Sequence, residues 1–311
     1  MKYLFVINPV AGKGNKQQGI IDSVNRYFAD RQDFEIYLTS AAGDARKKAK
    51  AAAESGEEVT IFACGGEGTV FEVLNGIVGY ENVRLGVIPC GSANDFLKYF
   101  KDSAPFSDIT EQIEGTAVPA DIIKANDYYC LNGCSVGMDA VVARDMSIFK
   151  GWRGVSGSMA YKLAVVKTFF GKIGVNINLS VDNGIPVKKD CLFAVIANAP
   201  YYGGGYKSAP DADPFDGQLD FTSVKTISKL KVPKFLSLYE NGLHGKLDYC
   251  TLSRCESMEF TADEPVPVNL DGEIIESKHM RFSLISGGIR FNLPRSVYQN
   301  VKKSLKVFDF T

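Results

Sequence analysis

The chain falls into two parts that differ in how hydrophobic and polar positions alternate. In the first 125 residues, short apolar runs are separated by longer stretches in which apolar residues recur at helical spacing. Asp44 stands at an expected helix N-cap, and Gly56 at an expected C′ position. Strands alternating with helices of this length form βαβ units and a parallel sheet. The expected strands are 2–7, 34–38, 59–63 and 85–88, and the expected helices are about 15–29, 44–55, 69–79 and 93–100.

After about residue 125 the pattern becomes rich in strands. Turn sequences such as Asp182-Asn183-Gly184 and Gly287-Gly288 separate the apolar runs and favour hairpins. Helical patterns remain only near 137–149, 157–170 and 228–240. The expected strands are 174–181, 190–199, 218–224, 255–262, 266–270, 279–285 and 288–293.

These patterns predict a fold of the class α/β plus β. We expect a parallel α/β domain over residues 1–125 and a second, antiparallel β-rich, sandwich-like domain over 126–294. The last stretch, 295–311, does not continue the strand pattern. It is expected to return to the first domain.

Three glycine-bearing turns in the first domain each follow a strand and open a helix. They read NPVAGKG from Asn8, GGEGT from Gly65 and GSAND from Gly91. Such a turn lets backbone N–H groups crowd an anion, and the helix N-terminus adds partial positive charge. Three of them along the carboxyl edge of one parallel sheet predict a phosphate-binding crevice, and hence a nucleotide.

Each turn also has a simpler interpretation. The first turn lacks the third glycine of G-x-G-x-x-G, since Gln17 stands there, and it lacks the Lys-Ser/Thr of a P-loop. Glu35 lies near the start of the second strand, whereas a dinucleotide site needs an acidic residue at its end. Turn glycines without a ligand remain an alternative. Glu67 is unusual in a phosphate-binding turn, because its carboxylate repels the ligand unless a cation lies between them.

Two acidic clusters lie in the second half of the chain. Asp211, Asp213, Asp216 and Asp220 provide oxygen ligands suited to Mg²⁺ or Ca²⁺, without matching an EF-hand loop. A solvated acidic loop is the alternative. The sequence Asp271-Gly272-Glu273 follows an apolar strand, and a D-G hairpin turn is its simplest interpretation.

Composition narrows the class of protein. The chain has 311 residues and a formal net charge of −1, which gives no reason to expect nucleic acid as a partner. Seven scattered cysteines favour reduced thiols in a cytoplasm. Two histidines make a histidine zinc site improbable. We expect no signal peptide and no membrane-spanning segment, so any membrane contact is peripheral.

The helix expected at 157–170 is the candidate segment for peripheral contact with a membrane. Met159, Leu163, Val166 and Phe170 share one helical face. A helix of the protein core is the simpler interpretation, and anchoring on an anionic membrane surface is the alternative.

Together these motifs resemble the diacylglycerol kinase catalytic-domain family, especially its bacterial soluble lipid kinases. NPVAGKG is similar to the family's N-P-x-x-G opening, and GGEGTVFEVLNG to G-G-D-G-T-x-x-E-V-x-N-G. GSANDF resembles G-T-x-N-D-F/L-A, and YCLNGCSVGMDAVV resembles N-x-x-G-x-G-x-D-A. DPFDGQLD and NLDGE resemble the metal-site loop and the catalytic aspartate motif. The resemblance covers essentially the whole chain.

The resemblance implies roles for individual residues. It implies Mg²⁺ at Asp213, Asp216 and the carbonyl of Gln218, with Asp271 as general base and Glu273 as its neighbour. Two residues depart from the family pattern: Glu67 replaces the usual Asp, and Ser92 the usual Thr. Asp139, within GMDA, is interpreted as structural. The ATP site is implied at Asn8, Thr39, Gly65, Gly66, Glu67, Gly68, Thr69, Glu72, Ser92, Asn94 and Asp95.

We therefore expect an ATP- and Mg²⁺-dependent lipid kinase whose nucleotide and lipid bind between the domains. The lipid is presented at a membrane surface, and the protein is cytoplasmic, with peripheral contact at the inner membrane face. An enzyme similar to NAD kinase, which shares the G-G-D-G-T turn, is one alternative. A nucleotide-binding regulatory protein impaired by the change at Glu67 is another. Diacylglycerol, other glycerolipids, a sphingoid base and an isoprenoid alcohol stay open as acceptors, and a homodimer stays open as the assembly.

Overall fold

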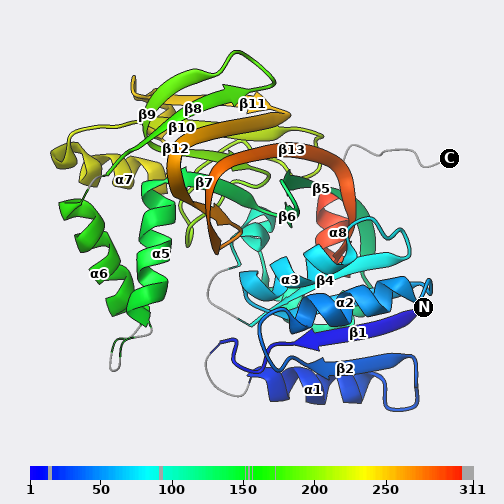
Figure 1. The fold of residues 1–311 in the computed structure, drawn as a ribbon. Coiled ribbons are helices and arrows are strands. Elements are labelled where there is room, and N and C mark those ends of the chain that lie inside the picture. Colours follow the sequence, from blue (N-terminus) through cyan, green and yellow to red (C-terminus); the bar gives the residue numbers. More distant parts are fainter. Residues whose placement is uncertain are drawn as a thin grey trace. The chain divides into compact units, whose positions relative to one another are not determined.

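The computed structural model describes residues 1–302 except 13–15, 91–93, 151, 153–154, 156 and 172 (Figure 1). The chain forms two compact units. The first contains Met1–Ile122, Pro214–Gly217 and the residues from Ile285 onward, and the second contains Ile123–Asp213 and Gln218–Leu284. Residues 285–294, which the sequence patterns assigned to the second domain, thus lie in the first unit.

The first unit is built on a parallel sheet in the order β13-β4-β3-β1-β2. β1 and β2 begin and end at the predicted residues, and the C-terminal part of β13 joins β4 through Phe291 and Leu85. The parallel α/β first domain is therefore confirmed. The strands are β1 (Lys2–Ile7), β2 (Phe34–Leu38), β3 (Val59–Gly65), β4 (Val83–Pro89) and β13 (Glu273–Leu293).

Helices follow the strands of this unit. Phe28, directly after α1, packs with Phe5 and Phe62 in a buried cluster, whereas α2 and α3 pack on each other. At Gly76 a Cβ would lie 2.6 Å from the carbonyl oxygen of Arg46, so glycine permits the close approach of α3 to α2. The helices are α1 (Lys16–Tyr27), α2 (Asp44–Glu54), α3 (Glu67–Ile77), α4 (Ile109–Ile113) and α8 (Arg295–Val301), with 3₁₀ turns η1 (Asp95–Phe100) and η2 (Ala104–Ser107).

The second unit is a sheet in the order β11-β10-β9-β7-β12-β13, with β8 against β9 and β12. These pairs are antiparallel, which confirms the β-rich second domain. β5 (Thr116–Ala125), which runs from the first unit into the second, had no predicted counterpart. The other strands are β6 (Tyr128–Cys130), β7 (Gly133–Gly137), β8 (Val175–Val181), β9 (Val187–Ala197), β10 (Leu219–Lys225), β11 (Cys250–Cys255) and β12 (Ser257–Leu270).

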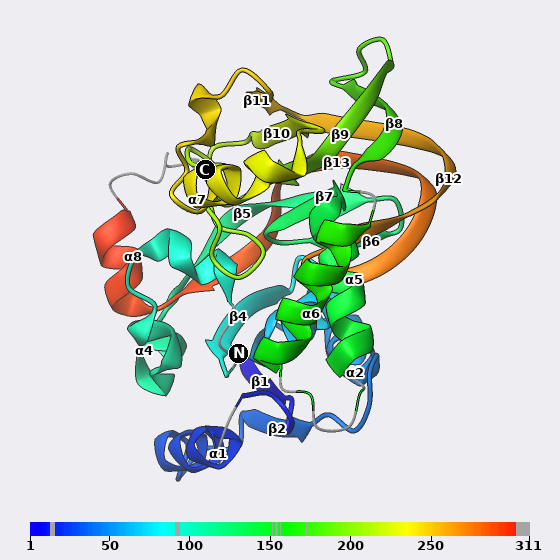
Figure 2. The same ribbon diagram turned by 90° about the vertical axis from the view of Figure 1, so that its left-hand side faces the viewer.

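Three α-helices of the second unit match the predicted helical patterns. α7 (Val232–Glu240) packs Phe235 and Tyr239 on Phe193 of β9. α5 (Met138–Lys150) and α6 (Gly157–Phe170) run side by side in both ribbon views (Figures 1 and 2). Two 3₁₀ turns, η3 (Lys229–Lys231) and η4 (His244–Lys246), flank α7.

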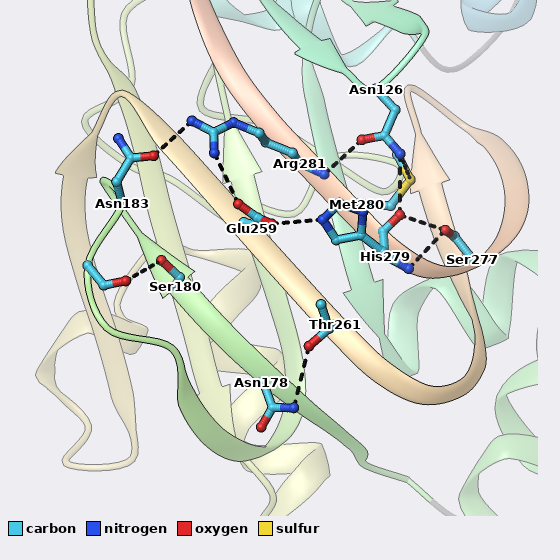
Figure 3. Close-up of polar contacts among 11 residues, drawn as sticks. Asn126, Asn178, Ser180, Asn183, Glu259, Thr261, Ser277, His279, Met280 and Arg281 are labelled. Carbon is cyan, nitrogen blue, oxygen red and sulfur yellow. Dashed lines mark hydrogen bonds and ion pairs between the residues drawn. The ribbon is translucent and has the colours of Figure 1, made fainter.

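Polar side chains on β12 and β13 form a connected group (Figure 3). Arg281 donates to Glu259 at 3.1 Å and to Asn183 at 2.8 Å. His279 Nε2 lies 2.8 Å from Glu259 Oε1, and this hydrogen bond holds the pKa of Glu259 below its usual range. Such cross-strand pairs stabilise a sheet modestly. His279 is therefore a satisfied surface residue.

Candidate active site

The first turn of the N-terminal unit lies against the ends of two neighbouring strands. Asn8 follows β1, and its Nδ2 donates to Thr69 Oγ1 at 3.2 Å while its Oδ1 accepts from the Val10 N–H at 3.1 Å. Gly12 has a φ of 83°, and a Cβ there would lie 2.3 Å from the carbonyl oxygen of Cys90. Glycine is thus required both by backbone conformation and by space. The carboxyl ends of β1, β3 and β4 meet at this edge.

The second turn leaves the start of α3 open. A Cβ on Gly65 would lie 2.2 Å from Thr69 Oγ1, whereas a Cβ on Gly66 would meet no atom within 4 Å. Gly66 is the N-cap of α3 and supplies no capping side chain. A helix N-terminus with this geometry favours an anion such as a phosphate. Gly68 lies within the first turn of the same helix.

Two carboxylates expected at the nucleotide site make backbone contacts. Glu67 Oε1 accepts from the Asp95 N–H at 3.1 Å and so joins the start of α3 to the turn after β4. Glu72 accepts from the N–H groups of Gly43 and Ala45 at 2.7 and 3.1 Å. Glu72 therefore holds the start of α2. The geometry gives it a positioning role, and its contact with ATP stays a prediction.

The remaining expected nucleotide residues sit at the same edge. The Thr39 N–H donates to the Ile7 carbonyl at 2.9 Å, which places Thr39 directly after β2. Asn94 is the N-cap of η1, and its carbonyl accepts from Leu97. Asp95 is buried and forms an ion pair with Lys98 at 2.6 Å. Ser92 lies outside the described residues.

The acidic loop after β9 is held by a residue that the sequence did not single out. Asp121 of β5 accepts from the N–H groups of Gly217 and Gly287 at 2.7 and 2.8 Å, and its own N–H donates to the Pro214 carbonyl at 2.8 Å. It is 3% exposed. This role depends on the pairing of β5 with a loop that is far away in the sequence. No pattern in the sequence around Asp121 could therefore have predicted it.

The expected magnesium ligands remain a prediction. No group of three or more His, Cys, Asp or Glu side chains within metal-binding reach occurs in the described part of the chain. The expected set consists of two carboxylates, Asp213 and Asp216, and a backbone carbonyl, so such a group is not required. The Gln218 side chain accepts from Arg254 at 3.0 Å, and the backbone carbonyl of Gln218 stays the expected third ligand.

Asp271 occupies the hairpin turn between β12 and β13. Asp271 and Gly272 have φ values of 50° and 96°, so the D-G pair forms the expected tight turn with two positive φ angles. The Asp271 carboxylate points inward and is 8% exposed. It accepts from the backbone N–H groups of Leu131, Asn132 and Gly133 at 2.5 to 3.3 Å. Glu273 begins β13 and is exposed.

Burial and the three backbone N–H donors of Leu131, Asn132 and Gly133, which together form a cradle around the carboxylate, set the pKa of Asp271. Burial raises its pKa to about 6, because the ionised form is poorly solvated, and the three N–H donors oppose that shift. The Asn132 side-chain amide donates to the Tyr201 carbonyl at 3.0 Å, and the backbone carbonyl of Asn132 accepts from the Asn198 N–H at 2.8 Å. These bonds fix the 131–133 segment. A carboxylate with a pKa near 6 can accept a proton near neutral pH.

A second buried group lies along β7 and α5. Ser135 donates to Asp139 and lies 2.7 Å from the Tyr202 hydroxyl. Burial raises the pKa of Asp139 above its usual range. This enclosed network is consistent with a structural role for Asp139.

Comparison with protein families agrees with this geometry. The family model described as "Diacylglycerol kinase catalytic domain" matches residues 2–125. The model described as "YegS C-terminal NAD kinase beta sandwich-like domain" matches residues 132–291, about half of the chain. The chain therefore belongs to the diacylglycerol kinase catalytic-domain family.

Individual relatives cover both units. "Diacylglycerol kinase" of Bacillus subtilis is 27% identical, over 86% of this chain and 88% of its own length. "Probable lipid kinase YegS-like" of Shewanella frigidimarina is 29% identical, over 77% and 79%. A crystal structure titled as a diacylglycerol kinase from Bacillus anthracis shares the fold, with a TM-score of 0.68 and 22% identity over 95% and 98% of the two chains. Among the described residues, no helix combines the length and apolar character needed to cross a membrane.

Proposed function

We propose that the protein is an ATP-dependent lipid kinase that transfers the γ-phosphate of ATP to the hydroxyl of a lipid such as diacylglycerol. The observation that carries the proposal is the Asp271 carboxylate, buried in its N–H cradle with a pKa of about 6. Family membership supports the same class of reaction.

The first unit supplies the nucleotide-binding part of the proposal. The open N-terminus of α3 at Gly66 and the Asn8–Thr69 contact form an edge suited to phosphates. When bound, ATP supplies the phosphoryl group and Mg²⁺ offsets its negative charge. Glu67 would face a cation there, and Asp213 with Asp216 would hold a second, loop-stabilising Mg²⁺. The reaction requires this nucleotide to meet the lipid and Asp271 between the two domains.

The proposed role of Asp271 is that of general base. As the lipid oxygen bonds to phosphorus, its O–H bond breaks and the proton passes to the carboxylate, while ADP leaves. At neutral pH a group with a pKa of about 6 is mostly ionised and ready to accept that proton. The N–H donors from Leu131 to Gly133 hold the carboxylate in a fixed orientation. Orientation is a large part of what such a site contributes.

A cavity in the second unit supports an apolar acceptor. Its volume is about 500 Å³, and α5, α6, β8 and β12 contribute to its wall. The wall combines apolar side chains with the buried hydroxyl of Thr168 and with charged side chains, which are Arg144, Asp145, Lys167, Asp263 and Glu264. The apolar lining includes Met138, Val141, Ile173, Val175 and Val266. The apolar part of this wall is suited to the hydrocarbon chain of a lipid.

We place the reaction at the cytoplasmic face of a membrane. All seven cysteines are free thiols, which supports a reducing compartment. The lipid acceptor itself is delivered by the membrane.

The decisive experiment measures phosphoryl transfer from labelled ATP to a panel of lipids and to NAD. Transfer to a lipid is expected, and transfer to NAD alone would support the alternative enzyme. ATP binding without any transfer would support the regulatory protein. Asp271→Asn should reduce kcat by roughly 10² to 10⁴ while ATP binding by the first unit persists. Glu240→Gln, which changes an exposed acid at the end of α7 in the same unit, is the matched control and should retain full turnover.

A further inference from the structure

Several large apolar side chains of helix α6 face solvent. Among the side chains of α6 that the structure describes, the buried ones are small, Ala160, Ala164 and Thr168, and they recur every four residues. Its large apolar side chains Met159, Leu163, Val166 and Phe170 are exposed instead, and Phe170 is 80% exposed. A helix that only served the core would place large apolar side chains inward. Packing in the core does not account for the four large apolar side chains that α6 exposes, so this exposed face needs another explanation.

The neighbouring part of α5 extends the same surface. Ile148, near the end of α5, is exposed, and Trp152 just beyond it is 56% exposed and stacks edge-on against Phe149 at 4.9 Å. Six of the fourteen most exposed large apolar side chains in the described chain thus fall between residues 148 and 170. An apolar concentration of this kind marks an interaction surface. We call the six residues the α5–α6 apolar patch: Ile148, Trp152, Met159, Leu163, Val166 and Phe170.

Charge identifies the kind of surface that would cover the patch. The segment 144–172 contains six Lys and Arg residues and one acid, Asp145, although the whole chain has a net charge of −1. Asp145 is buried and is already paired with Lys167 at 2.9 Å and with Arg144 at 3.3 Å. The segment therefore carries a strong local excess of positive charge. Apolar and aromatic side chains among cationic ones fit the interface of an anionic bilayer.

We propose that the α5–α6 apolar patch docks the protein on an anionic lipid surface. Trp152, Phe170 and the aliphatic side chains enter the headgroup boundary, and the excess positive charge of segment 144–172 attracts the lipid phosphates. Trp152 suits that depth because indole rings favour the membrane interface. The proposal deepens the lipid-kinase assignment and rests on it for its purpose, because a membrane-bound acceptor has to be reached where it lies. Docking itself requires no catalysis, so it can be measured alone.

The chain's single tryptophan provides a direct readout. The full-length protein is mixed with vesicles of phosphatidylcholine alone or of equal parts phosphatidylcholine and phosphatidylglycerol. On the anionic vesicles we expect co-sedimentation, a blue shift of Trp152 emission and quenching of that emission by brominated lipid chains. High sodium chloride should weaken the binding, because the cationic contribution is screened. Co-sedimentation without a change in Trp152 emission would overturn the proposal, since another surface would then be responsible.

Substitutions at two exposed positions test the patch against a matched control. Phe170→Ser should lower the apparent affinity for anionic vesicles by about tenfold, because it removes one large apolar side chain from the interface. Ile185→Ser is the control, because Ile185 is 88% exposed in the same unit but lies outside the patch. Its vesicle affinity should equal that of the wild type. Equal losses in both variants, or none in Phe170→Ser, would contradict the proposal.

The same samples separate this proposal from its alternatives. Sedimentation without vesicles shows whether the patch instead binds a second copy of the chain. A dimer dissolved by Phe170→Ser, with no vesicle binding by the wild type, would assign the patch to self-association. Failure of the lipid-kinase assignment would give a different result. The wild-type protein would then bind anionic vesicles with shifted Trp152 emission but would phosphorylate no lipid. That result would support docking and contradict the lipid-kinase assignment.

Discussion

Glu67 accepts a hydrogen bond from the backbone N–H of Asp95 at 3.1 Å, which joins the start of α3 to the turn after β4. Glu67 is also the position at which the chain departs from the family's usual aspartate. The Glu67 carboxylate, at the start of the helix after β3, therefore holds a turn that follows a different strand. The departure thus has a structural use as well as an electrostatic cost beside a phosphate site.

This relationship predicts different outcomes for two substitutions at Glu67. Glu67→Gln keeps an oxygen acceptor for Asp95, so the free energy of unfolding should fall by only about 0.5 kcal/mol through the lost helix N-terminal charge. Glu67→Ala leaves the Asp95 N–H without this acceptor and should cost about 1–2 kcal/mol. Urea denaturation measures both. Calorimetric ATP titrations with and without magnesium should show a reduced magnesium effect in Glu67→Gln, and an unchanged magnesium effect would remove Glu67 from the cation site.

The open space beside Gly66 predicts where phosphate binds. Gly66→Asp should abolish ATP binding and leave the melting temperature nearly unchanged, because its Cβ meets no protein atom while its charge faces the phosphate. Gly19→Asp is a suitable control, since a Cβ at Gly19 on α1 also meets open space. It should bind ATP like the wild type. Equilibrium titration with a fluorescent ATP analogue measures both variants, and retained affinity in Gly66→Asp would place the phosphates elsewhere.

The local features of the fold could be predicted from the sequence because they depend on neighbouring residues. β1 and β2 follow from short apolar runs, and the turn at Asp271-Gly272 follows from residues that tolerate positive φ. The helix expected from residue 93 proved to be a 3₁₀ turn from Asp95 to Phe100. Its first residues belong to the turn that Glu67 holds, and tertiary contacts decide such short segments.

The supporting contacts of the site could not be predicted in the same way. Asp271 meets the N–H of Leu131, which is 140 positions away, and Asp121 meets Gly287 at a separation of 166. No periodicity encodes pairings at that distance. Glu72 likewise accepts from N–H groups at the start of α2, a contact that no local pattern indicated, and its implied contact with ATP stays a prediction.

Removal of the loop carboxylates tests the magnesium prediction. Asp213→Asn with Asp216→Asn should erase any rise in melting temperature that magnesium gives the wild type. Asp121→Ala is the contrasting variant, because it leaves the N–H groups of Gly217 and Gly287 without their carboxylate. It should destabilise the protein by about 2–4 kcal/mol with or without magnesium. Scanning fluorimetry over a magnesium series measures all three proteins, and a wild type indifferent to magnesium would indicate a solvated loop.

The raised pKa of Asp271 predicts a pH-dependent stability. The pKa is about 6 in the folded protein against 3.8 for an ordinary Asp, so between these values the folded state binds more protons than the unfolded state. The stabilisation is fully present below pH 3.8 and is lost as pH rises through about 6. A shift of this size corresponds to about 3 kcal/mol. The Asn variant has no carboxyl group to titrate, so subtracting its unfolding free energy isolates this contribution from that of other ionisable groups.

The same ionisation should govern catalysis with the opposite sign. A general base has to be deprotonated, so kcat/KM on an accepted lipid should rise as pH increases through about 6, while the stability of the wild type relative to Asp271→Asn falls over the same interval. Urea denaturation and initial rates across a pH series measure the two midpoints, with Glu240→Gln as the control for both. Coincident midpoints would tie the cradle around Asp271 to the reaction. A kinetic midpoint far from the midpoint of the stability difference would assign the proton transfer to another group.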